Sequence, residues 1–179
     1  MKREINPFDY AGEVFKALPG GILLTTKRGE KINTMAIGWG SIGIEWSRPI
    51  FIAFVRESRH TKQLLEANGE FTVNISVGNV DKKILGFCGT KSGRDLNKIE
   101  ALGLHLEEPV SISVPGIREL PLTLECKVLY KQQQDLSAIP DDILSRYYPE
   151  EDDTLHPGSD RDYHIAYYAQ ILKAYIIEE

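Results

Sequence analysis

Cysteines and long apolar runs are scarce in this chain of 179 residues, and positive charge is not in excess. The two cysteines, Cys88 and Cys126, are too few for a disulfide scaffold or a cysteine-rich zinc site, and neither belongs to a CxxC motif. No apolar run is long enough to cross a membrane, and the N-terminus lacks the apolar core of a signal peptide. We therefore expect a soluble, cytoplasmic protein with no membrane association.

The formal net charge is −5 at pH 7, and no basic stripe interleaved with aromatic residues interrupts it. Because nucleic-acid backbones are bound by clustered Lys and Arg, this balance argues against a nucleic-acid partner. The histidines show no metal-ligand spacing, so no metal site is expected. The length suits one domain with a proper core, and no linker or internal repeat marks a boundary, so residues 1–179 are expected to form a single domain.

Residues 34–66 predict a strand, a loop, a buried strand and then a helix that begins within a cluster of positive charge. The apolar run from Ile50 to Val55 has the length of a buried strand. Leu64 and Leu65 start a helical pattern that stops at Asn68-Gly69, and Ser58 is the expected N-cap. Between strand and helix lie the residues that can hold an anion: Arg56, Ser58, Arg59, His60 and Thr61.

A helix N-terminus attracts phosphate because its first backbone N–H groups and the positive end of its dipole are free. The two arginines and two hydroxyls at this point add charge-assisted donors. The pattern therefore predicts a phosphate site. A capped helix with solvated arginines is an equally weighted alternative.

The segment Gly38 to Gly43 matches the GxGxxG pattern of dinucleotide-binding folds. Those folds require a helix that opens inside the motif, whereas Pro49 would stop any helix within a few residues. We therefore reject a dinucleotide-binding fold. The glycines are interpreted as a loop, or as a place where the backbone approaches a flat ligand.

The remaining pattern is a series of short strands with few helices. Strands are expected at 22–26, 32–38, 71–77, 121–128 and 164–177, and short helices at 6–17, 79–85, 95–102 and 140–148. Asn79 is the expected cap of the helix over 79–85. Alternation in 71–77 predicts a half-buried strand, with Asn74 facing a ligand or solvent. Together these elements predict a closed or partly closed β-barrel with helices outside it.

The acidic segment 131–162 differs from the rest of the chain, with clusters such as Glu150-Glu-Asp-Asp153. It is interpreted as a solvated insertion or, less strongly, as a functional lid.

Several short motifs recur in a characteristic order: Asn33-Thr-Met-Ala36, Trp39-Gly-Ser41, Arg56-Glu-Ser-Arg-His-Thr61, Phe71-Thr-Val-Asn74, Phe87-Cys-Gly89 and Ser92-Gly-Arg-Asp95. In this arrangement, which covers most of residues 18–130, the chain resembles the flavin reductase-like family of FMN-binding split-barrel proteins, and its flavoredoxin branch in particular. The resemblance implies a mainly β, Greek-key split β-barrel with a few short peripheral helices. It also implies a homodimer with FMN bound near the interface.

The resemblance further implies the roles of individual residues. Thr34, Met35 and Ala36, continuing to Trp39, would lie along the isoalloxazine ring, and the cluster from Arg56 to Thr61 would hold the phosphate. Other contributors to the same pocket would be Asn74, Cys88, Gly89 and Ser92. Since the chemistry belongs to the cofactor, no catalytic acid, base or nucleophile is expected. Cys88 is interpreted as a small buried side chain against the flavin, with a redox role as the weaker alternative.

The implied activity is that of an FMN-dependent oxidoreductase, which is either a flavin reductase or a flavoredoxin-type electron-transfer protein. NAD(P)H or a redox protein would be the electron donor. The main alternative is a flavin-binding or carrier protein without NAD(P)H turnover. A related oxidase acting on a pyridoxal-type phosphate and a barrel that binds oligonucleotides are weaker alternatives.

Overall fold

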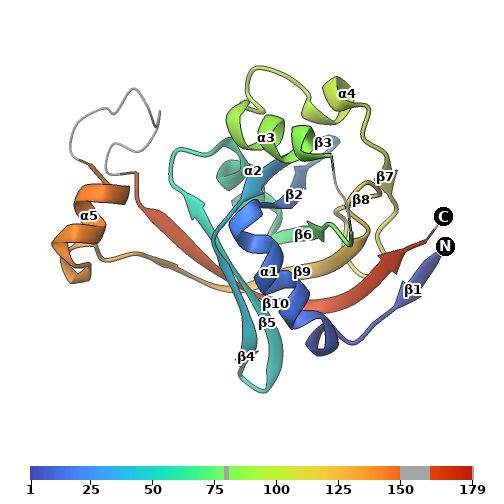
Figure 1. Ribbon diagram of the computed structural model, residues 1–179, viewed down its shortest axis with the longest axis horizontal. Helices are drawn as coiled ribbons and strands as arrows, with labels where there is room; N and C mark the ends of the chain where they lie inside the picture. The colour runs from blue at the N-terminus through green and yellow to red at the C-terminus, as the bar shows by residue number, and fades with distance from the viewer. Residues whose placement is uncertain (79–80, 150–161, 179) are drawn as a thin grey trace.

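The computed structural model describes residues 1–78, 81–149 and 162–178, and its centre is a single large antiparallel sheet (Figure 1). The strands follow one another in the order β3 (Lys31–Ile37), β2 (Ile22–Arg28), β6 (Glu70–Ile75), β9 (Leu122–Gln133), β10 (His164–Ile177), β5 (Arg48–Arg56) and β4 (Gly40–Glu45). Strand β1 (Lys2–Glu4) pairs with β10, and β7 (Leu106–Glu107) pairs with β8 (Gly116–Ile117). The expected mainly β architecture is confirmed.

The two ends of this strand order meet in space. Only Gly38 and Trp39 separate β3 from β4 in the chain, so the sheet must curl until its first and last strands lie close together. No ladder among the described strands joins β3 to β4 or β5, so the barrel stays split along this seam. Glycine suits position 40, because a Cβ there would be crowded, 3.0 Å from the Phe51 ring and 3.2 Å from the Ile52 carbonyl oxygen.

The loop expected over 38–43 is confined to Gly38 and Trp39, because residues 40–45 form β4. This strand pairs with β5 from Gly40–Ala53 to Glu45–Arg48. The connecting turn consists of Trp46 and Ser47, with positive φ values of 50° and 57°, and two such residues are the mark of a type I′ hairpin turn. Glycine is depleted in strands, so the glycines of this segment favoured a loop. The pairing with β5 in the tertiary structure makes the segment a strand.

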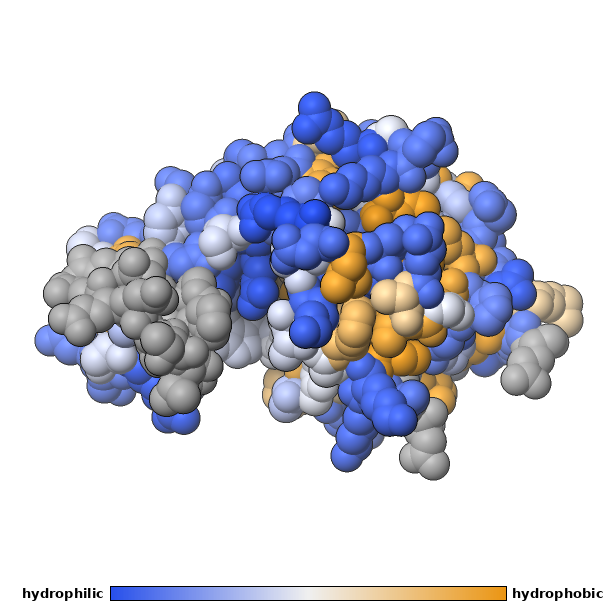
Figure 2. All heavy atoms as spheres, turned by 90° about the horizontal axis from the view of Figure 1, so that it is seen from above, coloured by the Kyte–Doolittle hydropathy of each residue, from blue (hydrophilic) through white to orange (hydrophobic). Residues whose placement is uncertain are grey.

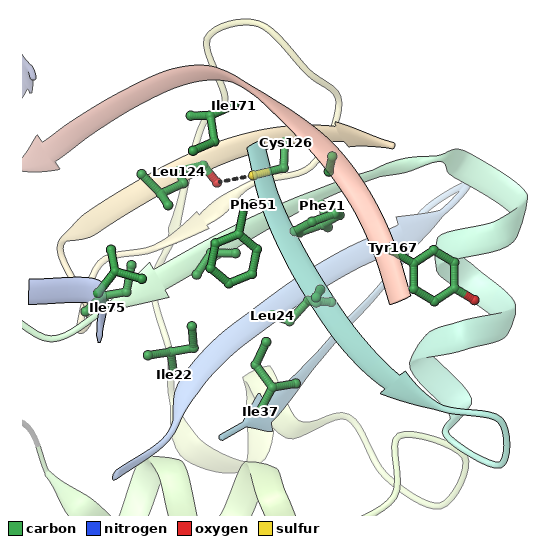
Figure 3. Packing of buried hydrophobic residues seen from close by; sticks show 14 of the residues in the cluster. Ile22, Leu24, Ile37, Phe51, Phe71, Ile75, Leu124, Cys126, Tyr167 and Ile171 are labelled. Atoms are coloured by element: carbon green, nitrogen blue, oxygen red, sulfur yellow. Dashed lines mark hydrogen bonds between the residues drawn. The ribbon is translucent and has the colours of Figure 1, made fainter. Parts of the chain in front are cut away.

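The barrel interior is filled by side chains from almost every strand, as Figure 3 shows around Phe51 and Phe71. Their ring centroids lie 6.4 Å apart in an edge-on arrangement, which aromatic pairs prefer. Cys126 is fully buried in this cluster, as its strand alternation predicted.

A second apolar cluster lies outside the barrel, where α3 (Lys82–Thr90) and α4 (Lys98–Leu102) cover β2 and β3.

The half-buried strand expected over 71–77 is wrong in one respect, which concerns Asn74. Asn74 is fully buried on the face expected to be polar, and its Nδ2 donates to the Leu120 carbonyl oxygen at 3.1 Å and to Thr123 Oγ1 at 2.8 Å. This side chain faces neither solvent nor a cavity.

Figure 2 looks onto the side that carries α3 and α4, where polar side chains predominate.

The helices largely follow the expected positions. The first region is η1 (Pro7–Tyr10), α1 (Ala11–Ala17) and η2 (Leu18–Gly20), and the acidic segment contains η3 (Leu136–Ala138) and α5 (Asp141–Tyr147), which stands at one end of the molecule (Figure 1). Helix α3 is capped by Asp81, whereas Asn79 lies outside the described residues. Helix α4 is shorter than expected because Asn97 caps it. Within the described residues 1–78, 81–149 and 162–178, no helix is both long and apolar enough to cross a membrane.

Helix α2 (His60–Asn68) ends at Gly69 as expected, but its N-cap is Arg59 and not Ser58. The Ser58 hydroxyl and N–H are both bonded to the Asp162 carboxylate. The start of α2 is therefore fixed by a residue about a hundred positions away, which local sequence cannot reveal.

Candidate functional site

A cavity of about 160 Å³ opens at the seam between the end of β3 and β5. We call this the seam cavity, and it is lined by residues 35–39, Phe54, Arg56, Arg59 and His164. Met35, Ala36 and Arg59 also line a neighbouring cavity of about 200 Å³, so the two form a continuous trough along β3.

The seam cavity has aromatic walls. The Trp39 ring lies 5.2 Å from the Tyr147 ring, edge-on, and 4.7 Å from the His164 ring, measured between centroids. His164 is buried, and its Nδ1 lies 2.6 Å from the Tyr148 hydroxyl. Burial, assisted by Arg56 and Arg59, lowers the pKa of His164 to about 3. The imidazole is therefore neutral at physiological pH and adds no charge to this wall.

The neighbouring cavity, which we call the cationic cavity, lies between the start of α2 and the end of α3. Its lining includes four cations, Arg59, Lys91, Arg94 and Lys98, and no carboxylate among the described residues. Lys98 is buried, its Nζ donates to the Cys88 carbonyl oxygen at 3.0 Å, and burial lowers its pKa. Arg94 donates to the Ser58 carbonyl oxygen at 2.9 Å. This concentration of positive charge, next to the N-terminus of a nine-residue helix, suits an anion.

His60 marks the same cavity in another way. Both of its ring nitrogens are buried and have no hydrogen-bond partner within the described part of the chain. Its pKa is lowered by burial and by the nearby charges of Lys31 and Arg94. Unpaired buried polar groups cost roughly 1–3 kcal/mol each, so a ligand that supplied partners would be stabilised here.

Arg56 and Ser58, expected to hold a phosphate, are bonded to the protein itself. The Arg56 guanidinium donates to the carbonyl oxygens of Asp162 at 2.8 Å and Tyr147 at 3.1 Å, and it lies over the Tyr148 ring. Burial lowers its pKa. The expected phosphate cluster is therefore divided between the cavities. The cationic cavity is lined by Ser58, Arg59, His60 and Thr61, and the seam cavity by Arg56 and again Arg59.

These contacts also place the acidic segment. Tyr147 and Tyr148 at the end of α5 pack on Trp39 and Arg56, and Tyr148 is buried. The C-terminal end of α5 is thus docked beside the seam cavity. Residues 150–161 lie outside the description.

Most of the other expected site residues line one of the two cavities, but two do not. Thr34 is fully buried, and its hydroxyl accepts from Thr25 Oγ1 at 3.0 Å, so its side chain is part of the sheet interior. Asn74 is held by the Leu120 carbonyl oxygen and Thr123 Oγ1, as described above. The side chains that do line the trough are those of Met35, Ala36, Trp39, Cys88 and Ser92, with Gly89 beside them.

Cys88 is buried, and burial raises the pKa of its thiol. A raised pKa disfavours the reactive thiolate, so the geometry supports the interpretation of Cys88 as a small wall residue.

Sequence reasoning missed several residues of the trough, namely Asn33, Phe54, Lys91, Gly93, Arg94, Lys98 and His164. Asn33, Arg94 and His164 lie within segments that the sequence analysis had already singled out, so a signal for them was present. Lys98 had no such signal, because nothing in a short helix indicates that one lysine will be buried.

This architecture is that of a split β-barrel with a ligand trough along its open seam. Residues 15–154 match the family model described as flavin reductase like domain, and the chain belongs to this family.

The chain is also similar to individual proteins and solved structures. An uncharacterized protein of Archaeoglobus fulgidus is 34% identical over 100 residues, which cover 56% of this chain and 55% of that protein, so the match spans little more than half of the relative. The crystal structure of flavoredoxin from Methanosarcina acetivorans has a TM-score of 0.62 and 24% identity, and the match covers 88% of this chain and 68% of that one. The crystal structure of nitrilotriacetate monooxygenase component B from Bacillus cereus has a TM-score of 0.65 and 18% identity, and the match covers 98% of this chain and 82% of that one. The expected split-barrel fold is confirmed.

Proposed function

We propose that this protein binds FMN and acts as an oxidoreductase of the flavin reductase or flavoredoxin type. The observation that carries the proposal is the trough along β3, which is aromatic at one end and strongly cationic at the other. A flavin mononucleotide has the same polarity, with a flat apolar ring system joined through a polyol to a phosphate. A flavoredoxin and an FMN-binding protein among the similar structures support the same choice.

The residues present fit this cofactor. The backbone of residues 35–39 and the Trp39 ring would border the isoalloxazine ring in the seam cavity. Arg59, Arg94 and Lys98 would balance the phosphate, and the unpaired nitrogens of His60 would gain a partner beside it. This cradle uses Arg94 and Lys98 in place of Arg56 and Ser58.

Bound FMN would supply electron transfer in one- or two-electron steps, and the protein would supply position and environment. Trp39 and Tyr147 would shield one end of the ring from water. The neutral His164 would leave Arg56 and Arg59 as the charged groups of that wall.

The test is an anaerobic titration of purified protein with FMN, riboflavin, NADH and NADPH, followed by visible absorption. We expect FMN to bind far more tightly than riboflavin, and the bound flavin to bleach with a reduced nicotinamide or a reduced redox protein. Bleaching by NADH or NADPH identifies a reductase, and bleaching only by a reduced protein or dithionite identifies an electron carrier. A protein that takes up no flavin would overturn the proposal.

We also propose that the protein forms a homodimer through the β4–β5 hairpin. Strand β4 is the last strand in the sheet order, and its hairpin exposes Ile44 and Trp46. Exposed apolar side chains on an unpaired edge are a common basis for association. Light scattering should give twice the chain mass. Ile44→Lys combined with Trp46→Asn removes both exposed apolar side chains and should give a monomer. Asn is chosen because it tolerates the positive φ at position 46. A monomeric wild type would contradict the assignment.

A further inference from the structure

His60 is the first residue of α2, and its ring is enclosed in the wall of the cationic cavity. A Cβ on Gly93 would lie 3.3 Å from His60 Cδ2 and 1.9 Å from Asn33 Oδ1, so glycine lets the turn after α3 close over both side chains. The Asn33 amide is already engaged, since its Nδ2 donates to Thr61 Oγ1 at 2.7 Å. Neither ring nitrogen of His60 therefore finds a partner within the described part of the chain.

The charged side chains that surround this ring in the described residues are cations, and they come from each neighbouring element. They are Arg59 at the N-cap of α2, Lys31 of β3, Lys91 and Arg94 of the segment after α3, and Lys98 of α4. Burial lowers the pKa of His60, and the positive charges lower it further. The Gln63 side chain has a smaller effect in the opposite direction, but it makes no hydrogen bond to either ring nitrogen.

Carboxylates do occur on the same segments, but they lie elsewhere. Glu30, Asp95 and Glu100 line an adjoining cavity and do not line the cationic one. The environment of His60 therefore keeps the imidazole neutral at physiological pH.

A neutral imidazole cannot satisfy both of its nitrogens with a phosphate. It carries one N–H donor and one acceptor nitrogen, whereas a phosphate dianion presents acceptor oxygens alone. A protonated imidazole carries two donors. The negative charge of the phosphate also offsets the surrounding cations, which are the groups that disfavour protonation. Entry of a phosphate thus reverses the electrostatic balance at His60.

We propose that His60 takes up a proton when the phosphate of FMN enters the cationic cavity, and that this uptake favours phosphorylated over unphosphorylated flavin. This inference rests on the proposed function, and it makes the loading of the protein dependent on pH. Solvent supplies the proton, because the second pKa of a phosphate monoester is about 6 and the free ligand is mainly a dianion at pH 7. Since the complex binds the proton, the affinity for FMN should rise as the pH falls, whereas riboflavin should bind without proton uptake.

The test is isothermal titration calorimetry of the purified protein with FMN at pH 7. Binding heats in two phosphate-free buffers of different ionisation enthalpy give the number of protons taken up. We expect the wild type to take up at least about half a proton more than His60→Gln. Gln keeps a donor and an acceptor at this position but does not titrate. His105→Gln is the matched control, because His105 is exposed and its ring is bonded to Glu119, so this variant should behave as the wild type.

A second readout is the ratio of the riboflavin to the FMN dissociation constant, measured by quenching of flavin fluorescence. From pH 8 to pH 6 this ratio should rise at least about three-fold more in the wild type than in His60→Gln. The comparison between the two proteins removes the titration of the phosphate itself, which is common to both.

Equal proton uptake by the wild type and His60→Gln, with FMN bound by both, overturns the inference alone. His60→Asn provides the same comparison if the Gln variant does not fold. A wild type that binds FMN without proton uptake overturns the inference without the need for any variant. Failure to bind any flavin overturns the proposed function and the inference with it.

Discussion

The two cavities of the trough meet at Arg59, yet they differ in how far their charged residues are bonded to the protein itself. At the seam, Arg56 donates through both terminal nitrogens to the carbonyl oxygens of Tyr147 and Asp162. In the cationic cavity, four cations and the unpaired His60 face a space with no described carboxylate. Arg94 and Lys98 each donate to one backbone carbonyl oxygen and keep further N–H groups for a ligand. Arg56 instead uses both of its terminal nitrogens to hold the chain at residues 147 and 162. The comparison separates the residues that shape the site from those that would bind the phosphate.

The largest expected effect concerns the cationic cavity. Replacing Arg59 and Arg94 by Ala removes two charge-assisted interactions with the phosphate, each worth roughly 1.5–3 kcal/mol. We expect the affinity for FMN to fall at least a hundred-fold and that for riboflavin, which lacks phosphate, to change little. Arg56→Ala is the matched comparison, and it should leave the ratio of the FMN and riboflavin dissociation constants unchanged. If Arg56→Ala raised the ratio of the FMN to the riboflavin dissociation constant as much as the double variant, the division between the cavities would be wrong.

A smaller effect, on stability, is expected at the seam. Arg56→Ala leaves the carbonyl oxygens of Tyr147 and Asp162 without their donor, and should lower the free energy of unfolding by about 2 kcal/mol. Urea denaturation of the flavin-free protein measures this change. Arg48→Ala is the control, because Arg48 is exposed and its bond goes to the Gln170 side chain, so it should cost about 0.5 kcal/mol or less. Equal losses in both variants would show that Arg56 is not a structural anchor.

The smallest effect is a pH dependence from His164. Its pKa is about 3 in the folded protein and 6.5 in an unfolded chain, so the unfolded state binds the proton first. Its contribution to stability is complete above pH 6.5 and is lost as the pH falls towards 3. Between pH 7.5 and 5.5 we expect a loss of about 1 kcal/mol in the wild type. Urea denaturation should show a flatter profile for His164→Gln, and parallel profiles would contradict the burial of a neutral imidazole.

The main features of the fold could be predicted because they depend on local pattern. The apolar run of β5, the stop of α2 at Gly69 and the alternation around Cys126 each reflect a period or a backbone preference confined to a few residues. Strand β4 could not be predicted in the same way. Its residues favour a loop, and only the pairing with β5 makes them a strand.

The candidate site shows the same division. Residues from β3 and from the start of α2 could be expected in one pocket, since a strand end and a helix N-terminus have recognisable residue patterns. Asn74 was expected in the site but does not line it, because the loop at 117–120 covers its side chain. The addition of Lys98 depends on the packing of α4 against β3, and that contact has no local signature.

By itself, the sequence determined a β-rich protein, the cluster of cations and hydroxyls at the start of α2, and the family to which these motifs belong. Only the tertiary structure decided which members of that cluster remain available. The reason is that an arginine binds whichever acceptors the fold brings within about 3 Å. For Arg56 these acceptors come from residues 147 and 162, about a hundred positions away along the chain.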